Sequence, residues 1–339
     1  YYSPGFDLFG SFPIAISAPP GLTNFTFFPS TGSDWVKAAD MMVMTLPRQI
    51  IPNATYLITR RCTQRQFLLH PIPVNTQIFS YCLAVAAERT GIILHAVTVL
   101  SNHWHAVVTD PQARVPEFLA YLHKYVAKAI NTKMRRGENL WSSEKPSIVT
   151  LGDGEDVAGK IVYTACNPVA AGLVAKTIHW PGLLAFFPGK KVTTERPTVF
   201  FNKDGDMPES ASFTIQKPPQ WAALSDGNWQ KRIQQQVEDQ EQLIAERMER
   251  ENQSFLGKDA VMKQQPTDTP RRIETRRTLD PKIAAKNKWL RIEALQRLQS
   301  FIQSYKDAFK RWRDGETNVF FPAGTYHLRH YAKVSCEAG

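Results

Sequence analysis

The succession of short apolar segments between residues 55 and 167 is the feature that most constrains the fold of this chain. Four of these segments have the β-branched and aromatic content of strands: residues 55–69, 92–100, 103–110 and 145–152. The second and third are separated only by Ser101 and Asn102, a connection short enough for a hairpin. We therefore expect four strands, of which the middle two pair with each other.

Three further segments have apolar residues three or four positions apart, which is the spacing of helices: residues 75–91, 115–137 and 154–167. Asn75 is a plausible cap of the first helix, Gly91 a stop signal, and Pro168 ends the third. The order along the chain is β-α-β-β-α-β followed by a helix. With right-handed crossovers, this order predicts an α+β fold, namely a ferredoxin-like antiparallel sheet with helices on one face, plus one further helix.

These elements predict a domain over residues 44–185, which is a normal domain size. Residues 1–43 are rich in Pro, Gly, Ser and Phe without periodicity, whereas Met44 opens a segment that looks like a natural start. We expect residues 1–43 to be poorly ordered or a wrongly included upstream extension, and we assign them no function.

Beyond this domain the character of the sequence changes. Residues 186–270 are expected to be a connector of loops and short strands that contains a polar helix over 225–256. Residues 261–272 have the composition of a linker. Residues 271–339 are expected to form a basic, mostly helical C-terminal region, with a helix over 281–314 and a strand-like segment over 325–334.

Charge and cysteine content narrow the class of partner. The chain of 339 residues has a net charge of +10 and a pI near 9.4, which favours a polyanion, nucleic acid before membrane, although a merely basic surface is the alternative. No run of 18 apolar residues occurs, so no membrane span is expected. The cysteines are far apart and lack a CxxC spacing, which is typical of reduced thiols in a cytoplasmic protein: Cys62, Cys82, Cys166 and Cys336.

Two histidines flank a tryptophan in "HWH" (103–105), inside one of the predicted strands. Because side chains alternate faces along a strand, His103 and His105 point to one face and Trp104 to the other. Two imidazoles on one face can share a metal ion, and a half-buried strand that carries two histidines without a metal is the alternative.

Tyr163 and Asn167 are four residues apart, so a helix places both on one face. A helix after the last strand can lay this face over the sheet beside His103 and His105. A metal held by the histidines and Asn167 would then polarise a phosphodiester, which Tyr163 would attack as a covalent nucleophile. The alternatives are a hydrogen-bonded core tyrosine and a helix-capping asparagine before proline.

Several motifs together resemble the single-tyrosine HUH transposases, specifically the REP-associated tyrosine transposases of bacteria. The resemblance lies in "SNHWHAVV" (101–108), "IVYTACNPVAAGLV" (161–174), "RRGENLW" (135–141), the opening "MTLPRQIIPNATYLITRRC" (44–62) and "HWPG" (179–182). The sequence departs from the family after Trp141, where "SSEKPS" replaces a basic or aromatic stretch, and this puts local DNA contacts there in doubt.

The resemblance covers residues 44 to about 183 and implies roles for individual residues. It implies that Tyr163 is the nucleophile, that His103 and His105 bind the metal, and that Asn167 is the third ligand. It also implies magnesium or manganese as the ion. Oxygen ligands and a phosphate substrate suit these ions, whereas imidazole also suits zinc, which is the less favoured choice. Lys160, one turn before Tyr163, is expected to lower the cost of ionising it, unless it is merely a solvated lysine.

Basic residues are expected to contact DNA phosphates: Arg60, Arg61, Lys124, Lys128, Lys133, Arg135 and Arg136, with Lys160 beside the tyrosine. Residues 271–313 add 13 Lys and Arg against 4 Asp and Glu. Aromatic residues at 301, 305 and 309 share a helix face, and we expect them to pack the tail onto the domain rather than to bind a single strand.

The leading hypothesis is a metal-dependent DNA transesterase that acts on single-stranded DNA with hairpins, in the cytoplasm at the nucleoid, as a monomer or homodimer. The 5′-phosphotyrosine link and the REP palindrome as substrate are what the resemblance implies. A catalytically idle DNA-binding regulator and a phosphodiesterase that uses metal-bound water are the alternatives.

Overall fold

The computed structural model describes residues 47–200, 207–270 and 281–337, which belong to one compact unit. The predicted extension over 1–43 lies outside these residues. The division of the rest into a domain, a connector and a C-terminal region stays a prediction.

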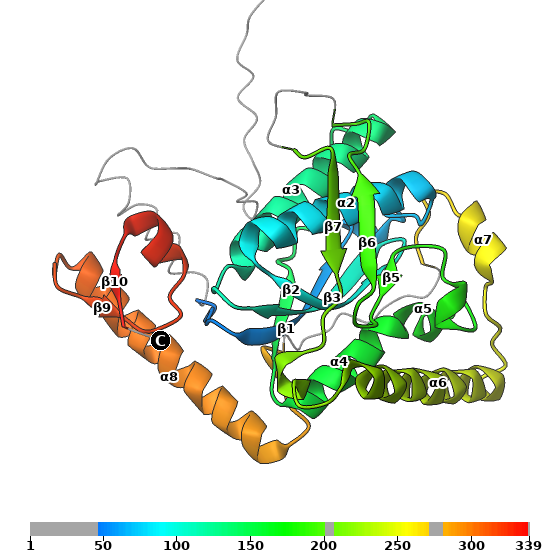
Figure 1. The fold of residues 1–339 in the computed structure, drawn as a ribbon. Coiled ribbons are helices and arrows are strands. Elements are labelled where there is room, and N and C mark those ends of the chain that lie inside the picture. The colour runs from blue at the N-terminus through cyan, green and yellow to red at the C-terminus, as the bar shows by residue number, and fades with distance from the viewer. Residues whose placement is uncertain (1–46, 201–206, 271–280, 338–339) are drawn as a thin grey trace, which may run out of the picture. The chain divides into compact units, whose positions relative to one another are not determined.

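A six-stranded sheet forms the centre of the fold (Figure 1), and its strands are ordered β5-β2-β3-β1-β4-β8. The four central strands are those predicted: β1 (Ala54–Arg61), β2 (Ile93–Val99), β3 (His103–Asp110) and β4 (Ser147–Leu151). All their pairings are antiparallel, in the ferredoxin-like order. The predicted fold class is therefore confirmed.

Two short strands extend this sheet at its edges, and the sequence analysis does not anticipate either of them. β5 (Leu184–Ala185) pairs antiparallel with β2, and β8 (Ile283–Ala284) pairs parallel with β4. Each has only two residues, too few for an alternating pattern to stand out in the sequence. The C-terminal region thus contributes a strand to the same sheet as the predicted domain.

Helices cover both faces of the sheet (Figure 1). α2 (Pro73–Thr90) and α3 (Val115–Met134) pack on one face, against a cluster that includes Ile58 and Trp104. α4 (Gly154–Ala165) packs on the opposite face, where Leu57 and Val107 are buried. This two-sided cover follows from strand alternation, since both sets of side chains are apolar.

The start of α2 differs from the prediction, because Ile72 and not Asn75 is the N-cap residue. Pro73 occupies the first helical position, where its missing N–H costs nothing. Asn75 lies inside the helix, and its amide donates to the carbonyl of His70 at 2.8 Å. Gly91 ends the helix as predicted, with a φ of 70° that favours glycine.

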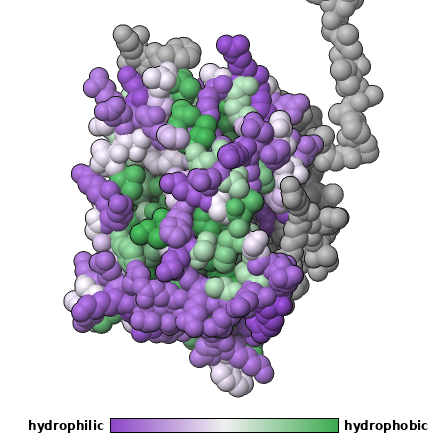
Figure 2. Space-filling model, turned by 90° about the vertical axis from the view of Figure 1, so that its right-hand side faces the viewer, coloured by the Kyte–Doolittle hydropathy of each residue, from purple (hydrophilic) through white to green (hydrophobic). Residues whose placement is uncertain are grey.

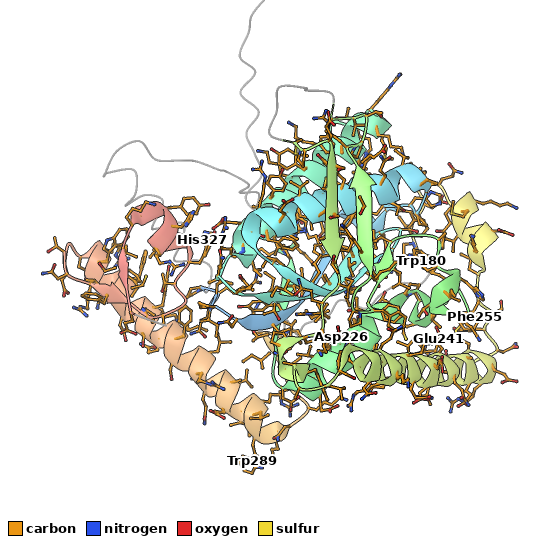
Figure 3. The ribbon with its side chains drawn as sticks, in the orientation of Figure 1. Trp180, Asp226, Glu241, Phe255, Trp289 and His327 are labelled. Carbon is orange, nitrogen blue, oxygen red and sulfur yellow. The ribbon has the colours of Figure 1, made fainter. Side chains whose placement is uncertain are left out.

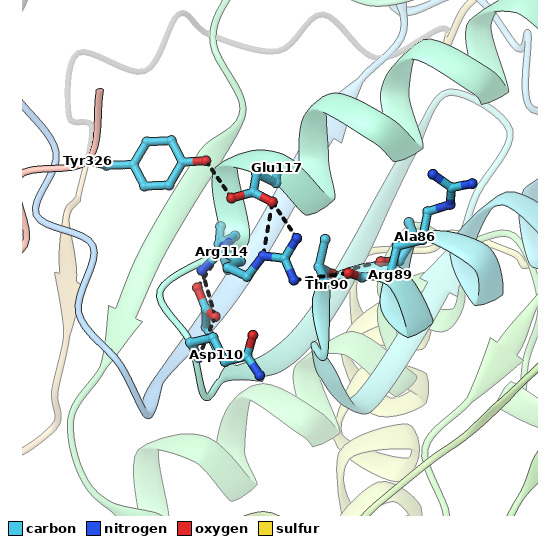
Figure 4. Close-up of polar contacts among 9 residues, drawn as sticks. Ala86, Arg89, Thr90, Asp110, Arg114, Glu117 and Tyr326 are labelled. Carbon is cyan, nitrogen blue, oxygen red and sulfur yellow. Dashed lines mark hydrogen bonds and ion pairs between the residues drawn. The ribbon is translucent and has the colours of Figure 1, made fainter. Parts of the chain in front are cut away.

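The start of α3 is fixed by a buried carboxylate (Figure 4). Asp110 accepts hydrogen bonds from the backbone N–H groups of Arg114 at 2.9 Å and Val115 at 2.7 Å. Burial raises the pKa of this carboxyl, and the N–H donors oppose that shift. Glu117 in the first turn accepts from Arg114, and from the hydroxyl of Tyr326 at 3.1 Å, so it ties the C-terminal region to α3.

The helix that carries the candidate nucleophile is shorter than predicted. It ends at Ala165, and a separate turn, α5 (Asn167–Ala170), begins at Asn167. Pro168 explains the break, because proline fits the first turn of a helix but interrupts a helix interior. Asn167 is therefore not a C-terminal cap of α4.

The connector is more structured than its sequence suggests. β6 (Lys191–Glu195) and β7 (Ser210–Thr214) form a two-stranded hairpin whose Phe213 joins the core cluster around α2. α7 (Lys258–Lys263) overlaps the beginning of the predicted linker, and this part of the linker prediction is wrong. Short 3-10 helices complete the connections: Thr63–Arg65, Thr177–His179 and Pro219–Trp221.

The polar helix α6 (Asp226–Arg250) packs on α4 through an apolar stripe. The stripe is buried at helical spacing: Trp229, Ile233, Val237, Ile244 and Met248. The carboxylate of Glu241, labelled in Figure 3, accepts from the backbone N–H of Thr177 at 2.7 Å. Hydrophilic side chains cover the lower part of the side shown in Figure 2, where α6 lies.

After β8, the C-terminal region contains α8 (Lys288–Arg313), β9 (Phe320–Phe321) and β10 (Ser335–Cys336). The segment predicted as strand-like instead holds a helical turn, Leu328–Ala332, between the two short strands that pair with each other. The three aromatic residues on one face of α8 pack within this region. Phe301 and Phe309 are buried, and Tyr305 lies 5.7 Å from the ring of Phe321.

All four cysteines are free thiols in the part of the chain that the structure describes, as predicted. Burial raises the pKa of Cys166 to about 12, which keeps this thiol protonated at neutral pH. Among the described residues, no helix has the length and apolar content needed to cross a membrane.

Candidate active site

The two histidines lie on the face of the sheet that α4 covers. Their ring centroids are 4.9 Å apart at 90° to each other. Trp104 points to the opposite face, where it is fully buried 5.6 Å from the ring of Phe79. The alternation predicted from "HWH" therefore matches the strand geometry.

Each imidazole is held by a polar partner at its Nδ1 atom. His105 Nδ1 lies 2.7 Å from the hydroxyl oxygen of Thr59, which is its cross-strand neighbour. His103 Nδ1 lies 2.6 Å from Asn102 Oδ1. Such outer partners fix the orientation of metal-binding histidines. The sequence analysis does not assign a role to Thr59 or Asn102, although strand register and adjacency to His103 could have indicated them.

The proton on His103 can be placed from this network. Asn102 Nδ2 donates to the carbonyl of Arg65 at 3.1 Å, so the Oδ1 atom of Asn102 faces His103 and accepts from Nδ1–H. In the neutral ring, Nε2 then carries a lone pair. That atom faces Asn167 Oδ1 at 3.3 Å, so two electron-pair donors point at each other.

This donor set fits a divalent cation. Two ligands about 2.1 Å from one ion lie roughly 3 Å apart when they subtend a right angle, close to the spacing of His103 Nε2 and Asn167 Oδ1. Among the described residues, no three His, Cys, Asp or Glu side chains group as a metal site. The amide oxygen of Asn167, 3.3 Å from His103 Nε2, is available as a ligand beside the two histidines.

Tyr163 lies beside this pair and is accessible. Its ring centroid is 5.5 Å from that of His105, and the residue is 42% exposed. Lys160 Nζ lies 5.3 Å from the centroid of the same ring. The ammonium group can therefore stabilise negative charge that develops on the phenol.

The other tyrosines of residues 47–185 differ from Tyr163 in burial or position. Tyr56 and Tyr81 are buried, and burial raises the pKa of both hydroxyls. Tyr121 and Tyr125 lie on α3, on the opposite side of the sheet, with their rings 4.4 Å apart. Within this segment, Tyr163 is thus the tyrosine that is both exposed and next to the histidines.

The basic residues predicted to bind DNA are spread over both sides of the sheet. Arg61 is the cross-strand neighbour of His103, on the face that carries the histidines. Arg60 points to the opposite face and donates to the carbonyls of Ser142, at 2.8 Å, and Glu144. Burial lowers the pKa of Arg60. A phosphate contact at Arg60 would have to replace these internal hydrogen bonds.

The remaining basic candidates lie on or just after α3, and the structure does not bring them next to Tyr163. Lys124, Lys128 and Arg135 are exposed. Lys133 donates to the side chain of Asn75 at 2.7 Å, and Arg136 pairs with Glu138 at 3.8 Å. These two have partners in the protein, and phosphate binding by all five stays a prediction.

Among known proteins, the chain is similar only to solved structures. No protein-family model matches the chain, and no curated protein matches it. One solved structure that matches is a REP-associated tyrosine transposase bound to a REP hairpin, at 19% identity over 40% of this chain and 78% of that chain, with a TM-score of 0.35. Another is a Deinococcus radiodurans R1 protein provisionally named a transposase, at 18% identity over 34% of this chain and 93% of that chain, with a TM-score of 0.26. The family that the sequence motifs resemble is thus also found among the structural neighbours.

Proposed function

We propose that this protein is a metal-dependent DNA transesterase that cleaves and rejoins single-stranded, hairpin-containing DNA. One observation carries the proposal: an exposed tyrosine lies against one of two neighbouring imidazoles, and the other imidazole faces a carboxamide oxygen. Tyr163 lies against His105, and His103 faces Asn167 at 3.3 Å. An exposed phenol beside such a donor set is suited to attack on a phosphodiester.

In the reaction, Tyr163 Oη attacks the phosphorus, and the bond from phosphorus to the 3′ oxygen of the preceding nucleotide breaks. The phenol loses its proton and the leaving oxygen gains one, so the products are a 5′-phosphotyrosine link and a 3′-hydroxyl. Attack by a 3′-hydroxyl on the same link rejoins the strand. The ammonium of Lys160 lies 5.3 Å from the centroid of the Tyr163 ring, beside the reacting group.

The cation that suits this chemistry is Mg²⁺ or Mn²⁺, with Zn²⁺ less favoured. His103, His105 and Asn167 would hold it, and when bound it would act as a Lewis acid on the phosphate. Thr59 and Asn102 orient the two imidazoles through their Nδ1 atoms. The net charge of +10 favours a polyanionic substrate.

The test is incubation of the full chain with single-stranded hairpin oligonucleotides and Mn²⁺, followed by a denaturing gel. We expect a covalent protein–DNA adduct that chelator prevents. Binding without cleavage would instead indicate a catalytically idle DNA-binding regulator. Cleavage without an adduct would indicate a phosphodiesterase that uses metal-bound water.

A further inference from the structure

A groove of about 600 Å³ runs along the outer side of α4. Three parts of the chain that are distant in sequence line it: α4 itself, α6, and the segment from β8 to the start of α8. Its polar lining includes Lys160, Gln236, Gln240, Lys286 and Arg291. A volume of this size suits an extended segment of one or two nucleotides, since sites for single small ligands span roughly 300–1,000 Å³.

The groove lies on the helix face that carries the candidate nucleophile. Asp156, Lys160 and Tyr163 are separated by four and three residues, so they lie above one another on α4. Asp156 and Lys160 line the groove, and Lys160 also lies against the ring of Tyr163. Lys160 therefore connects the groove to Tyr163, which does not itself line it.

Lys286 is held in this groove by two features of α4. Its backbone N–H donates to the carboxylate of Asp156 at 2.8 Å. Its ammonium lies over Gly159, only 3.7 Å from the point where a Cβ atom would be. Because Gly159 has no side chain, the ammonium of Lys286 reaches the same stretch of α4 as Lys160. Two positive charges thus face the groove within one helical turn of Tyr163.

The acidic residues of the groove already have partners. Glu155 pairs with Arg232 at 2.7 Å. Asp156 is buried and accepts backbone N–H groups, and Asp239 accepts from the amide of Gln235 at 2.9 Å. None of these contacts joins an acidic residue of the groove to the ammonium groups of Lys160 or Lys286.

We propose that this groove binds the single strand of DNA that flanks the scissile phosphate, with backbone phosphates against Lys160, Lys286 and Arg291. Gln236 and Gln240 lie four residues apart on α6. Because a glutamine amide both donates and accepts hydrogen bonds, these side chains can bind purine or pyrimidine bases. A positively charged groove that follows the backbone is the usual way to hold a single strand. This inference rests on the proposed function, because it places the strand by reference to Tyr163.

The test compares binding of hairpin DNA with and without a short single strand on its 5′ or 3′ side, by fluorescence anisotropy over a range of salt concentrations. The proteins are full-length wild type, Lys286→Gln, Gly159→Gln and, as a matched control, Lys191→Gln. Lys191 is an exposed lysine of β6, and the β6–β7 hairpin lies against α2 on the other side of the sheet.

For one of the two flanked substrates, we expect Lys286→Gln to weaken binding about 5- to 10-fold near 0.1 M salt. The slope of log affinity against log salt concentration should become shallower by about 0.7, which corresponds to the loss of one phosphate contact on a single strand. Gly159→Gln fills the groove and should weaken the same complex. Neither change should affect the bare hairpin, and Lys191→Gln should leave every substrate unchanged.

Equal affinity and salt slope for Lys286→Gln and wild type on both flanked substrates would overturn the groove assignment. If Gly159→Gln does not fold, as judged by circular dichroism, Lys286→Gln alone decides. If the proposed function is wrong and the groove assignment is right, wild type forms no covalent adduct, yet both groove variants lose binding to the flanking strand. If the adduct forms and the groove variants bind the flank normally, the transesterase stands and the groove assignment falls.

Discussion

Replacing Tyr163 with phenylalanine separates a chemical role from a structural one, because it removes one oxygen and keeps the ring. The residue is 42% exposed, and its contacts with His105 and Lys160 are made through the ring. An exposed substitution of this kind changes the free energy of unfolding by no more than about 0.5 kcal/mol. The hairpin affinity should likewise stay within about twofold, which is less than 0.5 kcal/mol.

Strand transfer should respond very differently to Tyr163→Phe. Loss of a covalent nucleophile removes a step that no neighbour can supply, and we expect adduct formation to fall at least about 10³-fold. The assay is adduct yield with Mn²⁺ on a denaturing gel, beside urea unfolding and hairpin binding. Tyr121→Phe and Tyr125→Phe on α3 are the controls and should keep the adduct. An adduct that persists in Tyr163→Phe and disappears in Tyr125→Phe would refute the assignment of the nucleophile.

Three other predictions concern the histidines. His103→Ala or His105→Ala should abolish cleavage while hairpin binding persists, and cleavage that survives both changes or resists chelator would exclude the metal site. Thr59→Val keeps the side-chain shape but removes the partner of His105 Nδ1, so the Mn²⁺ concentration for half-maximal cleavage should rise about 10- to 100-fold; an unchanged Mn²⁺ dependence would contradict this. Burial lowers the pKa of His95 from 6.5 to about 4, so between pH 6.5 and about pH 4 the folded state binds fewer protons at this residue than the unfolded state does. The free energy of unfolding should therefore fall by roughly 1.4 kcal/mol for each pH unit as the pH drops through this range. Burial lowers the pKa of His123 as well, to about 3, so a slope of the same sign remains without His95. Urea unfolding at several pH values should therefore show a slope that is smaller in His95→Gln than in wild type by about this amount, and equal slopes would refute it.

The order of the central strands was predictable because their segments are long and strongly patterned. β2 and β3 are joined by two residues, which leaves a hairpin as the natural pairing. The edge strands β5 and β8 were not predictable, since two residues such as Ile283 and Ala284 carry no period. Asn75 shows a different limit: asparagine often caps helices, but Pro73 sets the start of α2 first.

The candidate site was predictable where local geometry determines it. Strand alternation places His103 and His105 on one face. The predicted helical spacing of Tyr163 and Asn167 does not by itself place Asn167, because α4 ends at Ala165 and Asn167 begins α5. The partners of the imidazoles depend on which strands pair and in which register. Thr59 faces His105 only because β1 and β3 are aligned as they are, and one residue of slip would turn it away.

Packing of α4 determines where the Tyr163 hydroxyl lies, because an exposed side chain cannot fix its own position. Thr98 of β2 donates to the carbonyl of Thr164 at 2.6 Å, directly after the tyrosine. At the other end of the helix, Asp156 accepts from the backbone of Lys286, and the apolar stripe of α6 covers the helix between these points. The residues after 185 therefore act on the site through α4 even where they do not contact Tyr163. A chain shortened to the predicted domain of 44–185 would lose this support together with the groove wall, so reduced cleavage by such a fragment would not identify which of its lost residues bind DNA.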